Sequence, residues 1–244
     1  MWTRPDAAIE VTQKPMRLGG HSTVPNLSVA SDIPAADCHH DDMTSPADLE
    51  RQELAQLLLD SGPEAPTLCD GWNTRGLAAH LAVRDHRLDS MPGLMIPAFA
   101  SWTEKVRLGY AGRDYDALID LVRNPPWWNV VARAPFNVVE WFVHHEDVRR
   151  AQLGWTPRQL PRPTAEALWG MASMTRLLLR PTGLTVKLVS PDHGHRVIGK
   201  GAPQATLTGE PGEIVLFCFG RGQRAKVTID GEAAQTLREA RLGI

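Results

Sequence analysis

The sequence predicts a protein of mixed class: a four-helix bundle over residues 44–155, followed by a small α+β domain over residues 160–244. Apolar residues recur at helical spacing up to about Gly154, and short β-rich segments bounded by Gly, Pro and Asp come after it. The 244 residues are 43% hydrophobic, which is enough for a substantial core. We therefore expect two folded regions behind an N-terminal tail.

Residues 1–43 are expected to be a disordered tail. They are rich in Pro, Asp, His and Ser and have no sustained apolar period, so they bury too little surface to offset chain entropy. A translation start at Met43 would explain this segment, because a helix signal follows directly. The histidines and aspartates of residues 39–42 offer metal ligands, but adjacent residues on a flexible segment lack a fixed geometry. A solvated polar tail is the favoured interpretation.

The first helix of the bundle is expected to end at Asp60. Ser45 is the candidate N-cap, Pro46 occupies the first turn and Asp48 follows three residues after the cap, which resembles a capping box. Helical spacing divides its side chains between two faces. The residues expected to face inward are Leu49, Leu54, Leu57 and Leu58, and those expected to face solvent are Glu50, Arg51 and Glu53.

Three further helical regions complete the predicted bundle. One helix starts near Asn73, whose side chain can cap it. The next region covers residues 101–123 and is interrupted near residues 109–113. The last helix begins after Pro135 and ends near Gly154.

The C-terminal segment alternates helices with strands, which favours a small antiparallel or mixed sheet. The predicted helices are "ALWGMASMTRLLLR", "EPGEIVLFCFG" and "GEAAQTLREARL". The predicted strands are "GLTVKLVS", "HRVIG", "QATLTG" and "AKVTIDG".

Composition argues against several classes of partner and location. A net charge of −2 with both signs interspersed gives no reason to expect nucleic acid or an anionic membrane as partner. No apolar run reaches the length of a membrane span, and the N-terminus lacks the layout of a secretory signal, so a cytoplasmic protein is expected. The cysteines Cys38, Cys69 and Cys218 are far apart and odd in number, which indicates reduced thiols and no disulfide framework.

The stretch "NVVEWFVHHEDVRR", residues 137–150, places candidate functional residues on the last bundle helix. Glu140 and His144 are four residues apart and share one face with Asp147. That face is expected to point into the bundle, where an unpaired carboxylate would cost several kcal/mol and needs a partner. The residues expected on the opposite, solvated side are Glu146, Arg149 and Arg150, and His145 is expected to point away from the stripe of Glu140 and His144.

His80 supplies a third inward group, because it falls on the apolar stripe of Leu77 and Leu81 in the second helix. Two imidazoles and one carboxylate can bind a divalent ion and leave positions open for water or substrate. The alternative is a hydrogen-bonded core histidine beside an ordinary Glu-His pair, and spacing alone leaves both open. Asp147 could be a further ligand, an acceptor that orients an imidazole, or a salt-bridge partner of Arg84.

Two segments resemble a known family. "LCDGWNTRGLAAHLAVRD" and "VEWFVHHEDVRRAQ" are similar to the signatures of mycothiol-dependent maleylpyruvate isomerase-like proteins, within the DinB/YfiT-like superfamily. The resemblance covers residues 44–244 and implies a DinB-like bundle followed by a domain related to sterol carrier proteins. It also implies a divalent metal, usually zinc, bound by His80, Glu140 and His144.

The resemblance further implies an actinobacterial enzyme that acts with mycothiol on a small-molecule substrate, as an isomerase or S-transferase. "LFCFGRGQRAKV" is similar to the segment with the family's functional arginine, and Arg221 matches best, with Arg224 second. A surface arginine in a turn is the alternative. The segment "HHEDVRR" resembles a subgroup of the family whose members bind a metal and have no assigned substrate. Two alternatives therefore stay open: a non-catalytic, metal-stabilised ligand-binding protein, and a metallohydrolase.

Overall fold

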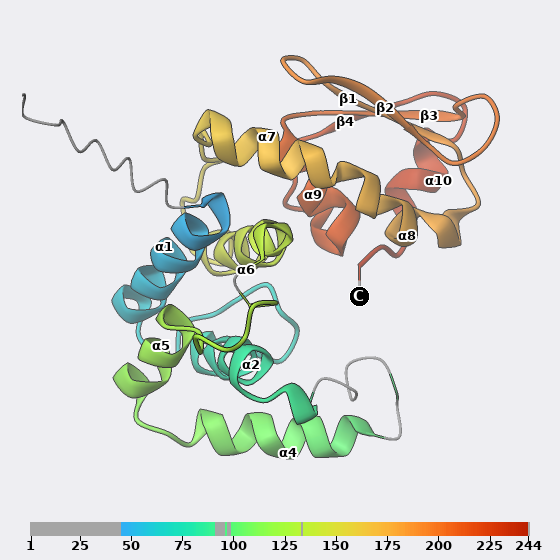
Figure 1. The fold of residues 1–244 in the computed structure, drawn as a ribbon. Coiled ribbons are helices and arrows are strands. Elements are labelled where there is room, and N and C mark those ends of the chain that lie inside the picture. The colour runs from blue at the N-terminus through green and yellow to red at the C-terminus, as the bar shows by residue number, and fades with distance from the viewer. Residues whose placement is uncertain (1–44, 91–95, 97–98, 133, 244) are drawn as a thin grey trace, which may run out of the picture. The chain divides into compact units, whose positions relative to one another are not determined.

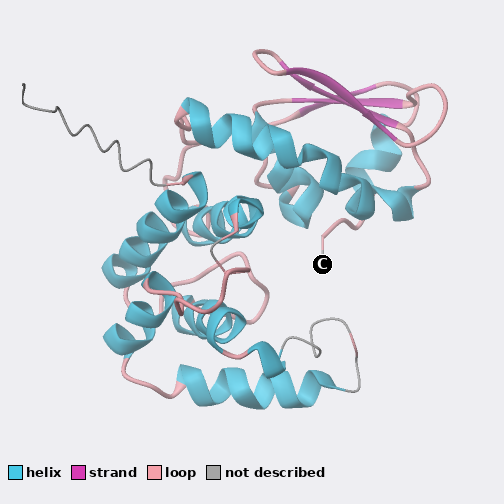
Figure 2. Ribbon diagram, in the orientation of Figure 1, coloured by secondary structure: helices cyan, strands magenta, loops and turns pink. Residues whose placement is uncertain are grey.

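The computed structural model describes residues 45–90, 96, 99–132 and 134–243. The chain separates into a unit of residues 1–41 and a second unit of residues 42–244. The described residues all belong to the second unit, and the tail expected over residues 1–43 lies outside them. Helices come first along this unit and a small sheet follows (Figures 1 and 2), which confirms the predicted α+β class.

The helices of the first part agree with the sequence pattern in order, and in extent except that α6 ends at Arg149 and not near Gly154. Their bounds are α1 Pro46–Ser61, α2 Thr74–His86, α4 Ala100–Ala111, α5 Tyr115–Arg123 and α6 Val138–Arg149, with 3-10 turns at η1 Leu88–Ser90 and η3 Pro135–Asn137. The capping predictions are confirmed, because Ser45 accepts a hydrogen bond from the backbone of Asp48 and Asn73 accepts one from Gly76. The predicted interruption is also present, between α4 and α5.

The predicted faces of α1 are wrong at three positions. Leu49 is 41% exposed, whereas Glu50 and Arg51 are 3% and 1% exposed. Arg51 is buried because its guanidinium is 2.5 Å from the Asp85 carboxylate and lies over the ring of Trp141. This ion pair joins α1 to α2, so the spacing of apolar residues within α1 alone could not predict that Arg51 is buried.

Helix α6 is buried on the side that was expected to be solvated. His145, Glu146 and Arg150 are all buried, and only Arg149 keeps partial exposure. The covering groups come from residues after α6: Glu213 of the C-terminal part pairs with Arg150 at 2.6 Å, and Arg158 of the preceding connection donates to Glu146 at 2.7 Å. The prediction failed because charged residues can be buried when each has an opposite partner.

The C-terminal part contains the predicted strands and shorter helices than expected. Its elements are α7 Arg162–Met171, η4 Ala172–Met174, α8 Thr175–Leu179, η5 Arg180–Thr182, β1 Val186–Ser190, β2 Gly194–Ile198, β3 Ala205–Thr208, α9 Pro211–Leu216, the π-type turn η6 Phe217–Arg221, β4 Thr228–Asp230 and α10 Ala234–Glu239. The single helix expected over residues 167–180 is broken into α7, η4 and α8.

The strands form a mixed sheet in the order β2-β1-β3-β4 over the described residues. β1 pairs antiparallel with β2 and parallel with β3, and β3 pairs antiparallel with β4. Alternate residues of β1 and β3, such as Leu188 and Leu207, are fully buried. Helices α7 to α10 lie on one side of the sheet (Figure 1), which explains why one face is apolar.

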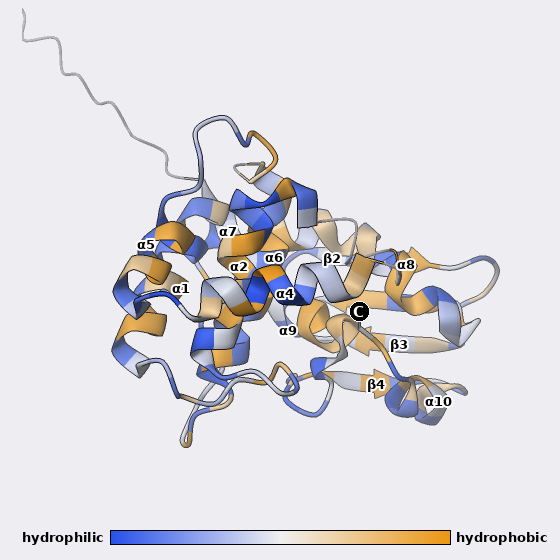
Figure 3. Ribbon diagram, turned by 90° about the horizontal axis from the view of Figure 1, so that it is seen from below, coloured by the Kyte–Doolittle hydropathy of each residue, from blue (hydrophilic) through white to orange (hydrophobic). Residues whose placement is uncertain are grey.

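Two clusters of buried apolar side chains support the site. One gathers residues of α1, α2, α4, α5 and α6, including Leu54, Leu77 and Trp141, and the other gathers the sheet and its helices around Leu188 and Cys218. Helices of the first part carry both hydrophilic and hydrophobic residues (Figure 3), as expected for elements that bury one stripe. Each fully buried leucine contributes about 1.5–3 kcal/mol of transfer free energy.

Three points stay predictions. The first part is expected to be a DinB-like four-helix bundle, the C-terminal part is expected to be related to sterol carrier proteins, and the boundary between them is expected at residues 155–160. Among the described residues, no helix combines the length and apolarity that crossing a bilayer requires.

Candidate metal centre

Helices α2 and α6 bring together the three side chains predicted to bind a metal. His80 lies in α2, and Glu140 and His144 lie one turn apart in α6. The Nε2 atoms of His80 and His144 are 3.7 and 3.5 Å from Oε1 of Glu140. One donor atom of each side chain lies within 4.8 Å of the other two. The donors therefore converge, and their binding of a metal stays a prediction.

The orientation of His80 follows from the sequence of α2. Asn73 fixes the start of the helix, and the neighbours Leu77 and Leu81 are fully buried, so the face that carries His80 is turned toward α6. The ring of Trp72 lies 5.1 Å from the imidazole, between ring centroids, and limits its movement. On α6, buried Val139 and Val143 flank the donors.

The donor set fits a divalent ion in chemistry and in spacing. Zinc bonds to nitrogen and oxygen of about 2.0–2.1 Å place two tetrahedral ligands about 3.4 Å apart. The two separations from Glu140, 3.7 and 3.5 Å, need only small side-chain adjustments to reach that value. Glu140 is less buried than expected, with a side chain 31% exposed. The donors are therefore reachable from solvent.

Electrostatics show that these groups already interact strongly. Burial by itself would raise the pKa of Glu140, but the neighbouring imidazoles of His144 and His80 hold that pKa well below its usual range. Burial would lower the pKa of His144, but Asp147, Cys69 and Glu140 raise it well above normal. Burial lowers the pKa of His80. Glu140 is thus an anion flanked by two imidazoles, as an oxygen ligand should be.

Arg84 lies beside this site. Its Nε is 3.6 Å from Oε1 of Glu140, and its Nη1 donates to Asp85 at 3.2 Å. The guanidinium also donates to the side chain of Asn137. The salt bridge considered between Arg84 and Asp147 is not formed in this structure, because Arg221 occupies that carboxylate.

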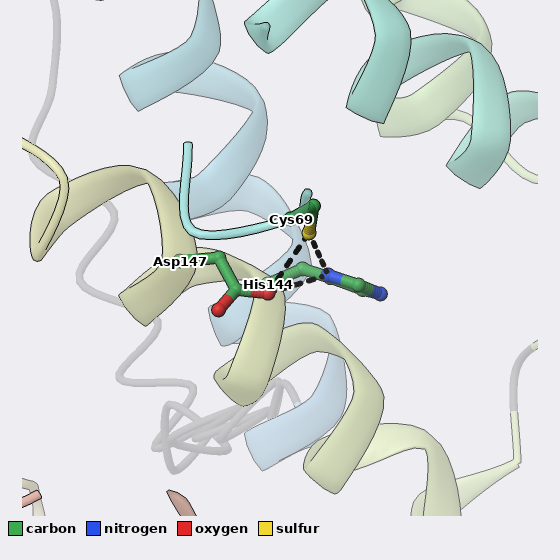
Figure 4. Close-up of side chains that lie close together, drawn as sticks. All are labelled: Cys69, His144 and Asp147. Atoms are coloured by element: carbon green, nitrogen blue, oxygen red, sulfur yellow. Dashed lines mark hydrogen bonds and ion pairs between the residues drawn. The ribbon is translucent and has the colours of Figure 1, made fainter. Parts of the chain in front are cut away.

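A second group of side chains meets the other edge of the His144 ring. Figure 4 shows Asp147 and Cys69 next to the same ring nitrogen, while the second nitrogen points away from both. Asp147 Oδ2 is 3.0 Å from Nδ1, and the Cys69 sulfur is 3.7 Å from Nδ1 and 3.2 Å from Oδ2. Leu68 donates its backbone N–H to the carbonyl of Asp147, which ties the Cys69 loop to α6.

Sequence reasoning did not single out Cys69 as a site residue. It occupies the loop before α2 and belongs to no periodic pattern, so only its place within the segment "LCDGWN" pointed toward the site. Its sulfur, with His144 and Asp147, is also a geometrically possible metal group. The structure therefore offers two donor sets that share one imidazole.

Arg221 reaches this second group from the C-terminal part. Its Nε and Nη2 donate to the two oxygens of Asp147 at 2.8 and 2.6 Å. Burial raises the pKa of Asp147, but His144 and Arg221 lower it to about 2. Arg224, the second candidate, is exposed. Arg221 thus lies at the site, and its catalytic role stays a prediction.

His145, which is buried next to His144 in the sequence, has a different environment. His145 Nδ1 is 2.9 Å from Oε2 of Glu50, and Glu53 completes a third possible metal group. Arg158 donates to both carboxylates at 2.8 and 3.1 Å, so they already have a cationic partner. We interpret this cluster as a structural ion network.

A cavity of about 400 Å³ lies on the side of α6 that faces the C-terminal part. It is lined by Phe142, Glu146, Arg150, Arg158 and residues of α9. None of the three predicted metal ligands lines it. The chemistry of the donor set, and not the cavity, therefore identifies the candidate site.

No protein-family model matches the chain, and no curated protein matches it. Solved structures of similar fold include mycothiol-dependent maleylpyruvate isomerase, with 16% sequence identity and a TM-score of 0.51 over 76% of this chain and 90% of that chain. A structure of a mutant of mycothiol-dependent maleylpyruvate isomerase gives 15% identity and a TM-score of 0.52 over the same shares. The likeness shows a shared fold.

Proposed function

We propose that the chain is a divalent-metal-dependent enzyme of the thiol-dependent isomerase or S-transferase type, with His80, Glu140 and His144 as the metal ligands. The observation that carries the proposal is the convergence of these three donors between α2 and α6. The fold is similar to that of mycothiol-dependent maleylpyruvate isomerase, which supports a low-molecular-weight thiol such as mycothiol as cosubstrate.

The ligand chemistry favours a catalytic site over a structural one. Two imidazole nitrogens and one carboxylate oxygen leave positions for an exogenous ligand, whereas structural zinc sites are closed by four protein ligands. A divalent ion, zinc in our proposal, would supply Lewis acidity that lowers the pKa of a bound thiol. Glu140 would contribute a negative charge that offsets part of the charge of the metal ion. Because its side chain is 31% exposed, a thiol could reach the site from solvent.

The reaction class follows from thiolate chemistry. A thiolate that adds to an electron-poor double bond converts it to a single bond, and expulsion of the thiolate after rotation gives the isomer with no net consumption of thiol. In a transferase the same nucleophile displaces a leaving group or opens an epoxide and stays bound to the product. We propose a small electrophilic molecule as substrate.

Metal analysis of the purified protein tests the proposal. We expect one divalent ion per chain, and loss of most of it in His80→Ala and in His144→Ala because each removes one of three ligands. The matched control is His195→Ala, since His195 is exposed on β2. Full metal occupancy in His80→Ala would contradict the ligand assignment.

Cobalt substitution tests the thiol. We expect added mycothiol to change the visible spectrum of the cobalt-loaded protein, because sulfur would enter an open position. A spectrum that does not respond to thiol would favour a metal-stabilised binding protein. Hydrolysis of ester or amide substrates without thiol would favour a metallohydrolase.

A further inference from the structure

A continuous chain of hydrogen bonds leads from the C-terminal part to the candidate metal centre. Arg221 donates to both oxygens of Asp147, and Oδ2 of Asp147 is 3.0 Å from Nδ1 of His144. The opposite nitrogen of that ring, Nε2, is 3.5 Å from Glu140. Each nitrogen of His144 thus faces a different carboxylate.

This geometry selects one form of the neutral imidazole. A neutral ring carries one proton, and the 3.0 Å contact of Nδ1 with Asp147 is a better hydrogen bond than the 3.5 Å separation of Nε2 from Glu140. The proton therefore lies on Nδ1 and donates to Asp147, and Nε2 is left with the free lone pair that a metal requires. Asp147 is fully buried, and the guanidinium of Arg221 pairs with its carboxylate at 2.6 Å. The thiol of Cys69 adds a third donor to Oδ2 of Asp147 at 3.2 Å.

Arg221 is itself held in place. Its third nitrogen, Nη1, donates to the carbonyl of Phe219 at 2.6 Å. The preceding Gly220 has φ +86, and a Cβ there would collide with the carbonyl of Leu242, so the C-terminal segment packs directly against this turn. All three guanidinium nitrogens therefore donate to acceptors in the protein, and the edge formed by Nε and Nη2, which could bind a carboxylate of the substrate, is already occupied by Asp147.

We propose that Asp147 is a positioning residue that fixes the ring of His144 with Nε2 toward the metal, and that Arg221 acts through Asp147 and not on the substrate. This inference rests on the proposed function for its purpose, because it assigns His144 as a ligand. It differs from the role predicted for Arg221 by resemblance, since the guanidinium holds a carboxylate of the protein.

The Asp147→Asn variant tests the inference, with Asp120→Asn as the matched control because Asp120 is exposed on α5. An amide is a weaker acceptor and also offers an N–H₂ donor, so the ring is no longer held in one form. We expect a 10- to 100-fold loss of zinc affinity in chelator competition, the usual effect of removing the partner of a ligating histidine. Unchanged affinity would overturn the proposal.

Nitrogen-15 NMR of His144 gives a readout that a general loss of stability would not produce. We expect the proton on Nδ1 in the wild type, both zinc-loaded and metal-free above the pKa of His144, and a mixed or reversed tautomer in Asp147→Asn. If the wild type binds no metal but shows this tautomer and loses it in the variant, the proposed function fails and the positioning role stands. A tautomer that the variant leaves unchanged overturns the positioning role.

Arg221 variants complete the test and keep it valid if Asp147→Asn does not fold. Arg221→Lys keeps the charge without the two parallel hydrogen bonds, so we expect zinc affinity between that of the wild type and that of Arg221→Gln. Wild-type zinc affinity together with the wild-type tautomer in Arg221→Gln would overturn its role through Asp147.

Discussion

At the scale of single residues, His144 has the central position, because both of its ring nitrogens face a carboxylate. Nε2 faces Glu140 and Nδ1 faces Asp147. Helical spacing alone predicted that these residues share a face, since they lie three and four residues apart. Spacing could not show which carboxylate lies beside His80 and which one pairs with Arg221, because His80 and Arg221 are distant from α6 in sequence.

The buried pair of Arg51 and Asp85 gives a prediction at this scale. Asp85→Ala should lower the free energy of unfolding by about 3–5 kcal/mol, because it leaves the Arg51 guanidinium buried without its counter-charge. Urea denaturation measures the change. Asp89→Ala is the control, since the Arg87–Asp89 pair is exposed, and it should have a much smaller effect. Equal effects of the two substitutions would contradict the importance of the buried pair.

At the scale of elements, α6 connects the candidate metal centre to the C-terminal part. One side carries Glu140 and His144, and the other side carries Glu146 and Arg150 within an ion network. The starts of α1 and α2 were predictable, because their N-caps Ser45 and Asn73 are local signals in the sequence. The burial of Glu146 and Arg150 was not, because their partners Glu213 and Arg158 lie outside the helix.

The packing of α9 against α6 can be tested with glycine variants. A Cβ on Gly212 would lie 2.6 Å from Cζ of Phe142 and 3.1 Å from Cδ1 of Leu160. Gly212→Ala should therefore lower the free energy of unfolding by about 1–3 kcal/mol through overpacking.

The matched control is Gly170→Ala, at a helical position where a Cβ meets no atom within 4 Å. It should raise stability slightly, by at most about 1 kcal/mol, because alanine restricts the unfolded chain. Thermal denaturation compares the two variants. A destabilised Gly170→Ala with a neutral Gly212→Ala would contradict the packing described.

At the scale of the whole molecule, residues distant in sequence complete the site. Cys69 comes from the loop before α2, Asp147 from α6 and Arg221 from the end of the π-type turn η6. The mixed fold class and the strands were predictable, because periodicity and turn residues are local signals. The link from Arg221 to His144 was not, because it depends on how the C-terminal part packs on α6.

X-ray absorption of the zinc-loaded protein without added thiol tests the metal assignment most directly, because it distinguishes the two donor sets that share His144. If His80, Glu140 and His144 bind the ion, the spectrum will show only nitrogen and oxygen neighbours at about 2.0–2.1 Å, with two imidazoles. Added thiol will then introduce a sulfur at about 2.3 Å. A sulfur neighbour before thiol is added would place Cys69 in the coordination sphere and contradict the assignment, as would failure to retain zinc.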